Sequence, residues 1–275
     1  MSHSRAIKGV RRAVLAALGI TIMGIGSAWA GPVSVWGFDM TSKWDTALTV
    51  FSSGNGPTTN DDTTLAWGNN SHPNQSSLVI GPNNASGTVN TDGAFADSGI
   101  IVTHNNYVIS LSSHILTSAA LFNTITLTPV TPPGASQAPI SFEFGINFDE
   151  TPNTAPCAVT SSPIPCNDIF VISKDSLNQT FTYDGYNYFL SLFPESATGG
   201  INFLSDAVCA AAGAASGCFG FTTEENTSNP LRFGLTITSS PIGVPEPATL
   251  GMVGLGLLTI VGLAIRRRKL SVKTS

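Results

Sequence analysis

The sequence predicts an all-β protein, an antiparallel and jelly-roll-like β-sandwich, followed by one C-terminal transmembrane helix. Three observations support this prediction. Apolar and polar residues alternate with a period of two in several segments, as they do in strands with one buried face. The chain contains 27 Gly and 17 Pro, many of them in clusters with Ser, Asn and Asp that are typical of turns. A continuous apolar run long enough to cross a membrane lies near the C-terminus, at 248–265.

The first 30 residues have the composition of a cleavable secretory signal peptide. A basic start is followed by an apolar run over 13–25, and Ala28 and Ala30 form the A-x-A pattern that precedes cleavage at Gly31. A retained membrane anchor is the alternative interpretation of this segment. We therefore expect a signal peptide at 1–30 and one ectodomain at 31–243.

Period-two alternation is clearest in three segments of the ectodomain. Between 140 and 148 every even position is large and apolar, and every odd position is polar or glycine, so one face of this strand is expected to be buried. The same alternation occurs over 121–128 and 231–238. Shorter candidate strands lie at 33–38, 78–80, 100–102, 107–111, 169–172 and 186–193. The one candidate helix covers 206–215. Long surface loops are expected at 54–62, 81–92 and 131–139.

The four cysteines form two groups with identical spacing. Eight residues separate Cys157 from Cys166, and eight separate Cys209 from Cys218. Four cysteines allow three pairings, and this local spacing in a chain with a signal peptide favours one disulfide within each group. A zinc site is the alternative, although zinc-binding cysteines commonly lie about two to four residues apart.

The C-terminal end has three features in a fixed order. They are Pro245-Glu246-Pro247, the apolar run over 248–265, and the basic cluster Arg266, Arg267, Arg268 and Lys269. Eighteen residues at about 1.5 Å each cover about 27 Å, which is enough to span a hydrocarbon core as a helix. The positive-inside rule places the basic cluster and the tail at 270–275 on the cytoplasmic side.

This ending, at 244–269, resembles the PEP-CTERM protein-sorting signal of Gram-negative bacteria. The resemblance implies recognition by exosortase, a membrane protease-transpeptidase. It also implies that the inner membrane holds the chain before processing, and that the product reaches the cell surface in organisms that make extracellular polysaccharide. By this resemblance the Pro-Glu-Pro and arginine residues are recognition elements for another enzyme.

The tetrapeptide Thr103-His104-Asn105-Asn106 matches the pattern T-H-x-N. Together with Trp67-Gly68 upstream, and with 148–153 and 166–171 downstream, it resembles the THxN family of PEP-CTERM proteins. This resemblance implies a location for the protein rather than a chemistry. Within the motif, His104 is either a ligand or acid–base group oriented by Thr103 and Asn106, or a structural histidine that binds a neighbouring loop. We favour the structural interpretation.

Acidic and amide residues gather around the first two cysteines. Asp149, Glu150 and Asp168 are the candidate metal ligands, with Asn153 and Asn167 near them. Hard oxygen ligands of this kind suit Ca²⁺, and two acidic loops that face solvent are the alternative. No other cofactor is expected. Paired carboxylates also serve glycoside hydrolysis, but the mature chain lacks the G-x-S-x-G, H-E-x-x-H and nucleotide-binding motifs, and we expect no catalytic residue.

The charge of the ectodomain is strongly negative. Three basic and sixteen acidic residues lie between Gly31 and Val244, a formal net charge of −13. Such a domain is not expected to bind nucleic acid, nor an anionic polysaccharide unless divalent cations bridge the two. The tryptophans are candidates for a sugar-stacking platform or for core packing; they are Trp36, Trp44 and Trp67.

The expected function follows from these features. We expect a non-catalytic, exported surface or matrix protein associated with exopolysaccharide in a biofilm. The alternative is a carbohydrate-binding module that Ca²⁺ assists, and a hydrolase that uses His104 or the carboxylates is the third hypothesis.

Overall fold

The computed structural model describes residues 31–68, 75–110, 112–160, 162–172, 177–196 and 201–242. The described residues from Pro32 to Ile242 belong to one compact unit. The predicted signal peptide, His72, the Pro-Glu-Pro motif and the apolar run at 248–265 lie outside the described residues. Within the part of the chain that the structure describes, no helix has the length and apolar character needed to cross a membrane.

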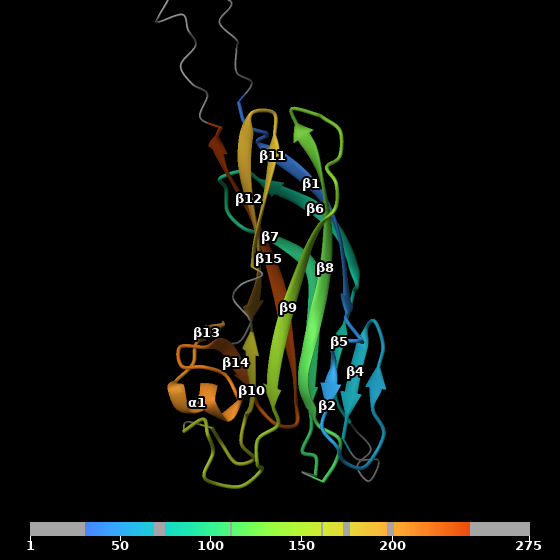
Figure 1. Ribbon diagram of the computed structural model, residues 1–275, viewed down its shortest axis with the longest axis vertical. Coiled ribbons are helices and arrows are strands. Elements are labelled where there is room, and N and C mark those ends of the chain that lie inside the picture. The colour runs from blue at the N-terminus through green and yellow to red at the C-terminus, as the bar shows by residue number, and fades with distance from the viewer. Residues whose placement is uncertain are drawn as a thin grey trace, which may run out of the picture. The chain divides into compact units, whose positions relative to one another are not determined.

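The structure confirms the all-β prediction, with two antiparallel sheets (Figure 1). In order across the first sheet, the strands are β13 (Asn202–Phe203), β14 (Phe219–Thr223), β10 (Asp168–Ile172), β9 (Ile140–Asp149), β8 (Leu116–Thr131), β1 (Val35–Trp44) and β6 (Asn84–Asn90), and β2 (Val50–Phe51) pairs with β8. In order across the second sheet, they are β11 (Asn178–Tyr183), β12 (Tyr186–Ser196), β15 (Thr227–Pro241), β7 (Ala96–Asn106), β5 (Ser76–Ile80), β4 (Thr64–Trp67) and β3 (Thr59–Asn60). The described part also contains a helix, α1 (Asp206–Ala211).

The three segments with the clearest alternation are strands at the centre of these sheets. They lie in β8, β9 and β15, and each strand buries one face. In β9, the even positions from Phe142 to Phe148 point into the core, as the alternation predicts. The register between β8 and β9 places Leu121 opposite Phe144, so that apolar residues of neighbouring strands meet on the same face.

Two local predictions were wrong. The expected loop at 81–92 contains β6, an edge strand that buries Val89 but few of its other side chains, so the strand shows no alternation. The expected strand at 107–111 is not a strand over 107–110. There, the Ser76 hydroxyl group bonds both to the N–H and to the carbonyl of Tyr107, so this side chain takes the place of a neighbouring strand.

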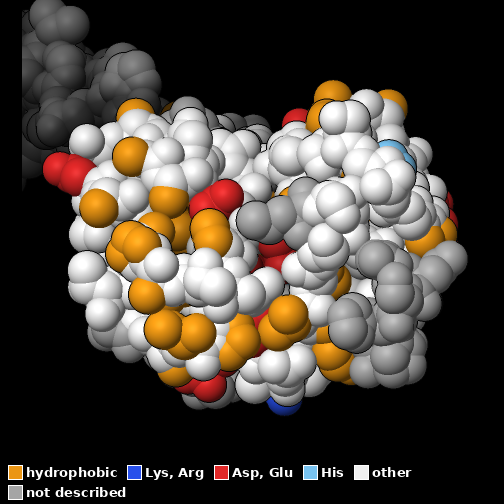
Figure 2. Space-filling model, turned by 90° about the horizontal axis from the view of Figure 1, so that it is seen from below, with side chains coloured by type: hydrophobic (Ala, Val, Ile, Leu, Met, Phe, Trp, Pro, Cys, Tyr) orange, Lys and Arg blue, Asp and Glu red, His pale blue; other side chains and the backbone are white. Residues whose placement is uncertain are grey.

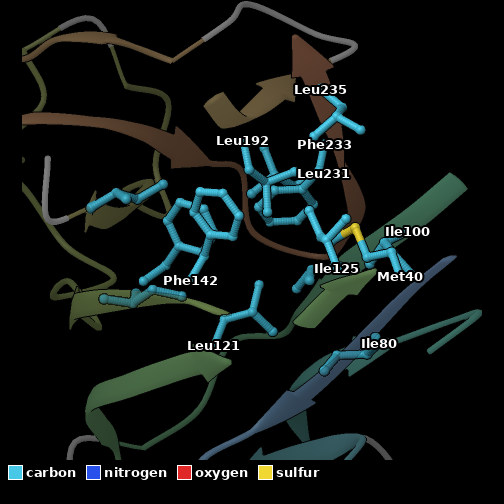
Figure 3. Close-up of a cluster of buried hydrophobic side chains, with 14 of the residues drawn as sticks. Met40, Ile80, Ile100, Leu121, Ile125, Phe142, Leu192, Leu231, Phe233 and Leu235 are labelled. Carbon is cyan, nitrogen blue, oxygen red and sulfur yellow. The ribbon is translucent and has the colours of Figure 1, made fainter. Parts of the chain in front are cut away.

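One apolar core contains side chains of both sheets. Figure 3 shows part of it, with Met40 of β1 and Phe142 of β9 from the first sheet and Leu192 of β12 from the second. All three predicted tryptophans are fully buried in this core: they are Trp36, Trp44 and Trp67. The tryptophans therefore serve core packing, and the sugar-stacking interpretation of them was wrong.

Helix α1 covers the outer face of β10. The helix begins after Ser205, whose side chain accepts a hydrogen bond from the N–H of Val208, and it ends before Gly213 with a φ of +66°. The helix and the loop after it bury Ile169 and Val171, so β10 is buried on both faces. Both predicted disulfides are confirmed: they join Cys157 to Cys166 and Cys209 to Cys218.

Candidate functional site

Four polar side chains meet where several strands of the two sheets end. Glu150 follows the last residue of β9, and Asp168 begins the antiparallel neighbour β10. Asp168 pairs in turn with Thr223 at the end of β14, and Glu225 lies in the turn after it. In the second sheet, Asn106 ends β7. Because these strands are antiparallel neighbours, ends that are distant in sequence lie together, at the lower end of Figure 1.

Three carboxylates form the centre of this site. One oxygen atom each of Glu150, Asp168 and Glu225 lies within 4.8 Å of the others. The side chains are almost fully enclosed, with exposed fractions of 5%, 0% and 8% in that order. We call these three residues the carboxylate cluster.

Few protein groups donate hydrogen bonds to the carboxylate cluster. Trp67 Nε1 donates to Glu150 Oε2 at 3.2 Å, and the N–H of Thr151 donates to Asp168 Oδ1 at 2.9 Å. The remaining oxygens, Glu150 Oε1, Asp168 Oδ2 and both of Glu225, have no hydrogen-bond partner among the described residues. Buried polar atoms in proteins normally have such a partner, so these four oxygens require an explanation.

Burial and mutual repulsion favour the neutral form of the carboxylate cluster. Burial raises the pKa of Glu150 and of Asp168 well above the usual range, and the pKa of Glu225 to about 7. The charges of the neighbouring carboxylates raise the first two pKa values further. No basic side chain among the described residues balances these charges, because Lys43 is exposed and Arg232 pairs with Asp97 at 3.4 Å on the surface. The cluster therefore needs protons or a cation.

The amide group of Asn106 adjoins the carboxylate cluster. Its side chain interacts with the carboxyl group of Asp168 and lowers the pKa of that group. Its Nδ2 atom donates a hydrogen bond to the carbonyl oxygen of Glu224 at 3.3 Å. The Oδ1 atom of Asn106 is buried and has no hydrogen-bond partner among the described residues. With the four carboxylate oxygens, Asn106 Oδ1 is the fifth buried oxygen at this site that has no hydrogen-bond partner among the described residues.

His104 is a buried neighbour of this site. Its Nδ1 atom lies 3.0 Å from the hydroxyl oxygen of Thr223, which links β7 to β14 in the other sheet. The imidazole ring stacks on Trp67, with 5.8 Å between ring centroids, and meets Phe170 edge to face. Burial lowers the pKa of His104 to about 3, so the ring is neutral at pH 7. A cavity of about 20 Å³ adjoins the ring, a space that fits about one water molecule.

The structure brings together only some of the residues that the sequence singled out. Glu150 and Asp168 of the predicted metal set belong to the carboxylate cluster, whereas Asp149 is not one of the three residues that meet there. Asn106 of the T-H-x-N motif adjoins the cluster, while Thr103 is on the opposite face of β7 from His104. Asn167 instead accepts a hydrogen bond from Ser162 within the first disulfide loop.

Glu225 was not predicted from the sequence. The acidic pair Glu224-Glu225 directly follows the last residue of β14, and this position at a strand end was the only available signal. The pairing of β14 with β10 brings Glu225 to Asp168. His114 lies elsewhere, with its Nδ1 atom 2.8 Å from the carbonyl oxygen of Ser52.

The chain carries a recognised sorting motif outside the described residues. Residues 243–269 match the family of the PEP-CTERM protein-sorting motif, in agreement with the predicted segment at 244–269. No curated protein matches the chain. Motifs of this kind are sorted by exosortase and imply export with processing at the membrane.

Proposed function

We propose that this chain is an exosortase-sorted protein of the cell surface or extracellular matrix, that it is non-catalytic and that it associates with exopolysaccharide. The observation that carries the proposal is the match of residues 243–269 to the PEP-CTERM protein-sorting motif. Exosortase is then the processing partner, and the two-sheet domain is the part that reaches the surface. The sequence resemblance to the THxN group, and the description of the domain as a jelly-roll-like sandwich, are parts of the same proposal.

The enclosure of the polar groups supports a non-catalytic role. The carboxylates of Glu150 and Asp168 are buried, and His104 adjoins a cavity of about 20 Å³. Pockets for small-molecule ligands commonly have volumes of about 300 to 1,000 Å³. A sugar substrate therefore has no room beside His104, which argues against the hydrolase hypothesis.

Replacement of Pro245, Glu246 and Pro247 by alanine tests the sorting step. We expect the wild-type chain to be shortened and delivered to the surface, and the variant to accumulate uncleaved in the inner-membrane fraction. Cell fractionation followed by immunoblotting measures both forms. Alanine at Ser271, Val272 and Lys273, beyond the matched residues, is the control and is expected to leave sorting unchanged. Unaltered processing of the Pro-Glu-Pro variant contradicts the proposal.

Binding of polysaccharide is a second candidate function, with Ca²⁺ as a bridge. The net charge of −13 between Gly31 and Val244 gives Ca²⁺ its role in this function, because an acidic domain repels an anionic polymer unless divalent cations bridge the two. The experiment is a pull-down of the exported protein on polysaccharide from the host cell, with Ca²⁺ or with a chelator. Retention only with Ca²⁺ supports this function, and no retention under either condition rules it out.

A further inference from the structure

We propose that Glu150, Asp168 and Glu225 hold one Ca²⁺ ion, that Asn106 Oδ1 is a fourth ligand, and that the ion joins the two sheets. The site rests on the geometry of the described residues and is independent of the sorting proposal. It differs from the set expected from the sequence, since Glu225 and Asn106 take part and Asp149 does not.

The spacing of the carboxylates suits one shared ion. Oxygen ligands lie about 2.3 to 2.6 Å from Ca²⁺, so two ligands on opposite sides of the ion are about 4.8 Å apart. The three carboxylate oxygens lie within 4.8 Å of one another. Ca²⁺ accepts six to eight oxygens in irregular arrangements, whereas Mg²⁺ requires a near-ideal octahedron. A site built from a turn and three strand ends favours the more tolerant ion.

Asn106 provides evidence for the ion that is independent of the acidic residues. Its side chain has an exposed fraction of 0%, it interacts with Asp168, and its Oδ1 atom has no hydrogen-bond partner among the described residues. A buried amide oxygen that lacks a hydrogen-bond donor is unfavourable, and a cation at this site would satisfy it. Ca²⁺ accepts the amide oxygen of asparagine as a ligand alongside carboxylate oxygens.

The carboxylate cluster lies close to an acidic part of the surface. Glu150 and Glu225 retain exposed fractions of 5% and 8%, and their unpartnered carboxylate oxygens are buried, so the carboxylate cluster lies just beneath the surface. Figure 2 shows the molecule from below, onto the end where these strands terminate, and acidic atoms lie in a hollow near the middle of that face. The strongly negative ectodomain attracts divalent cations toward this hollow.

The ligands come from both sheets. Glu150 and Asp168 belong to the first sheet, Asn106 to the second, and Glu225 to the turn that leads from β14 in the first sheet to β15 in the second. Ligation therefore closes this end of the two-sheet domain, because each sheet contributes at least one ligand. Binding stabilises the folded state, which alone assembles the ligands.

Terbium luminescence tests the site directly, because Trp67 lies beside it. Tb³⁺ replaces Ca²⁺ at oxygen sites and emits when a nearby tryptophan is excited, and Trp67 is hydrogen-bonded to Glu150 at 3.2 Å. The exported protein is purified from cells that produce the full chain and is treated with chelator. We expect saturable emission with one Tb³⁺ per chain, displacement of Tb³⁺ by Ca²⁺, and a higher Tm in Ca²⁺ than in chelator. No emission together with an unchanged Tm overturns the proposal, and an equal response to Mg²⁺ overturns the assignment to Ca²⁺.

Two neighbouring glutamates provide a matched pair of variants. Glu225→Gln removes a ligand charge with little change in volume, and Glu224→Gln changes the adjacent, exposed residue. We expect Glu225→Gln to weaken Ca²⁺ binding by about tenfold or more, and Glu224→Gln to leave binding unchanged. Asp168→Asn is expected to act like Glu225→Gln, and a thermal melt in chelator shows whether each variant is folded. Equal binding by folded Glu225→Gln and Glu224→Gln contradicts the proposed ligands.

Discussion

The indole Nε1 of Trp67 donates a hydrogen bond to Glu150 Oε2 at 3.2 Å. Trp67 ends β4 in the second sheet, and Glu150 follows β9 in the first, so this bond connects the two sheets. Both residues are buried, and a typical hydrogen bond within a protein contributes about 0.5 to 1.5 kcal/mol. The two sheets are therefore joined by a polar contact next to the candidate site as well as by their shared apolar core.

Trp67→Phe is expected to lower the free energy of unfolding by about 3 kcal/mol, since it removes this bond and leaves a cavity in the core. Urea unfolding measures the change. Trp44→Phe is the matched control, because Trp44 is also fully buried and its Nε1 has no hydrogen-bond partner among the described residues. Trp44→Phe is expected to lower the free energy of unfolding by less than Trp67→Phe does. An equal loss for both variants would show that the bond to Glu150 contributes nothing.

The burial of His104 predicts a loss of stability in acid. Burial lowers the pKa of His104 to about 3, below the value of 6.5 expected in the unfolded chain. The unfolded chain therefore takes up a proton first, and the stabilising contribution is complete above pH 6.5 and is lost as the pH falls toward 3. At pH 5 the expected loss is about 2 kcal/mol.

The variant His104→Gln isolates this contribution. The carboxylates act in the opposite direction, because their raised pKa values favour the folded state as the pH falls. Wild type and variant share those carboxylates, so the difference between their unfolding free energies reports on His104. We expect the difference to shrink by about 2 kcal/mol between pH 8 and pH 5, with chelator present. A difference that does not change with pH contradicts a depressed pKa.

The sequence predicted the central strands because their environment is asymmetric. In β9 one face is buried and the other is more exposed. The sequence from Phe142 to Phe148 therefore alternates between large apolar residues and polar residues or glycine. The edge strand β6 shows no such alternation of apolar and polar residues. In β6 the backbone pairs with β1 while most side chains stay exposed, so the composition resembles a loop. Pairing between backbones depends little on side-chain type, and only the sheet as a whole determines it.

Two of the three residues of the carboxylate cluster, Glu150 and Asp168, could be predicted, and the topology of the fold explains why Glu225 could not. The alternation in β9 continues to Glu150, an even and therefore inward position, and it places Asp149 outward. The alternation alone therefore distinguishes Glu150, which belongs to the carboxylate cluster, from Asp149, which does not. Glu225 lies far along the chain from Asp168 and reaches it only because the chain returns through α1 and β14 to pair with β10. A single sequence contains no signal for that pairing.

Replacement of Cys209 and Cys218 by serine is expected to lower the free energy of unfolding by about 2.5 to 3 kcal/mol, because the bond closes a loop of about ten residues. Guanidinium unfolding without reductant measures this loss. Serine at Cys157 and Cys166 opens a loop of the same length and is expected to cost a similar amount. A change below about 1 kcal/mol in both double variants would contradict the chain-entropy explanation.

Gly220 is required for the contact between β14 and β10. It pairs with Val171, and a Cβ atom at this position would overlap the carbonyl oxygen of Phe170, a backbone atom that has no freedom to move aside. Gly220→Ala is therefore expected to displace β14, to separate Thr223 from His104, and to lower the free energy of unfolding by about 3 kcal/mol. Thermal unfolding measures the stability, and the imidazole NMR signals of His104 report on its bond to Thr223.

Gly37→Ala is the control for this substitution. Gly37 also lies within a strand, β1, but the nearest atom to an added Cβ is a methyl group of Val130 at 3.5 Å, an ordinary contact distance. The control is expected to change stability by about 1 kcal/mol or less, in either direction. Gly220→Ala with wild-type stability and an unchanged His104 signal would mean that β10 and β14 tolerate a wider separation. The position of Glu225 would then depend on its own turn rather than on the pairing of these strands.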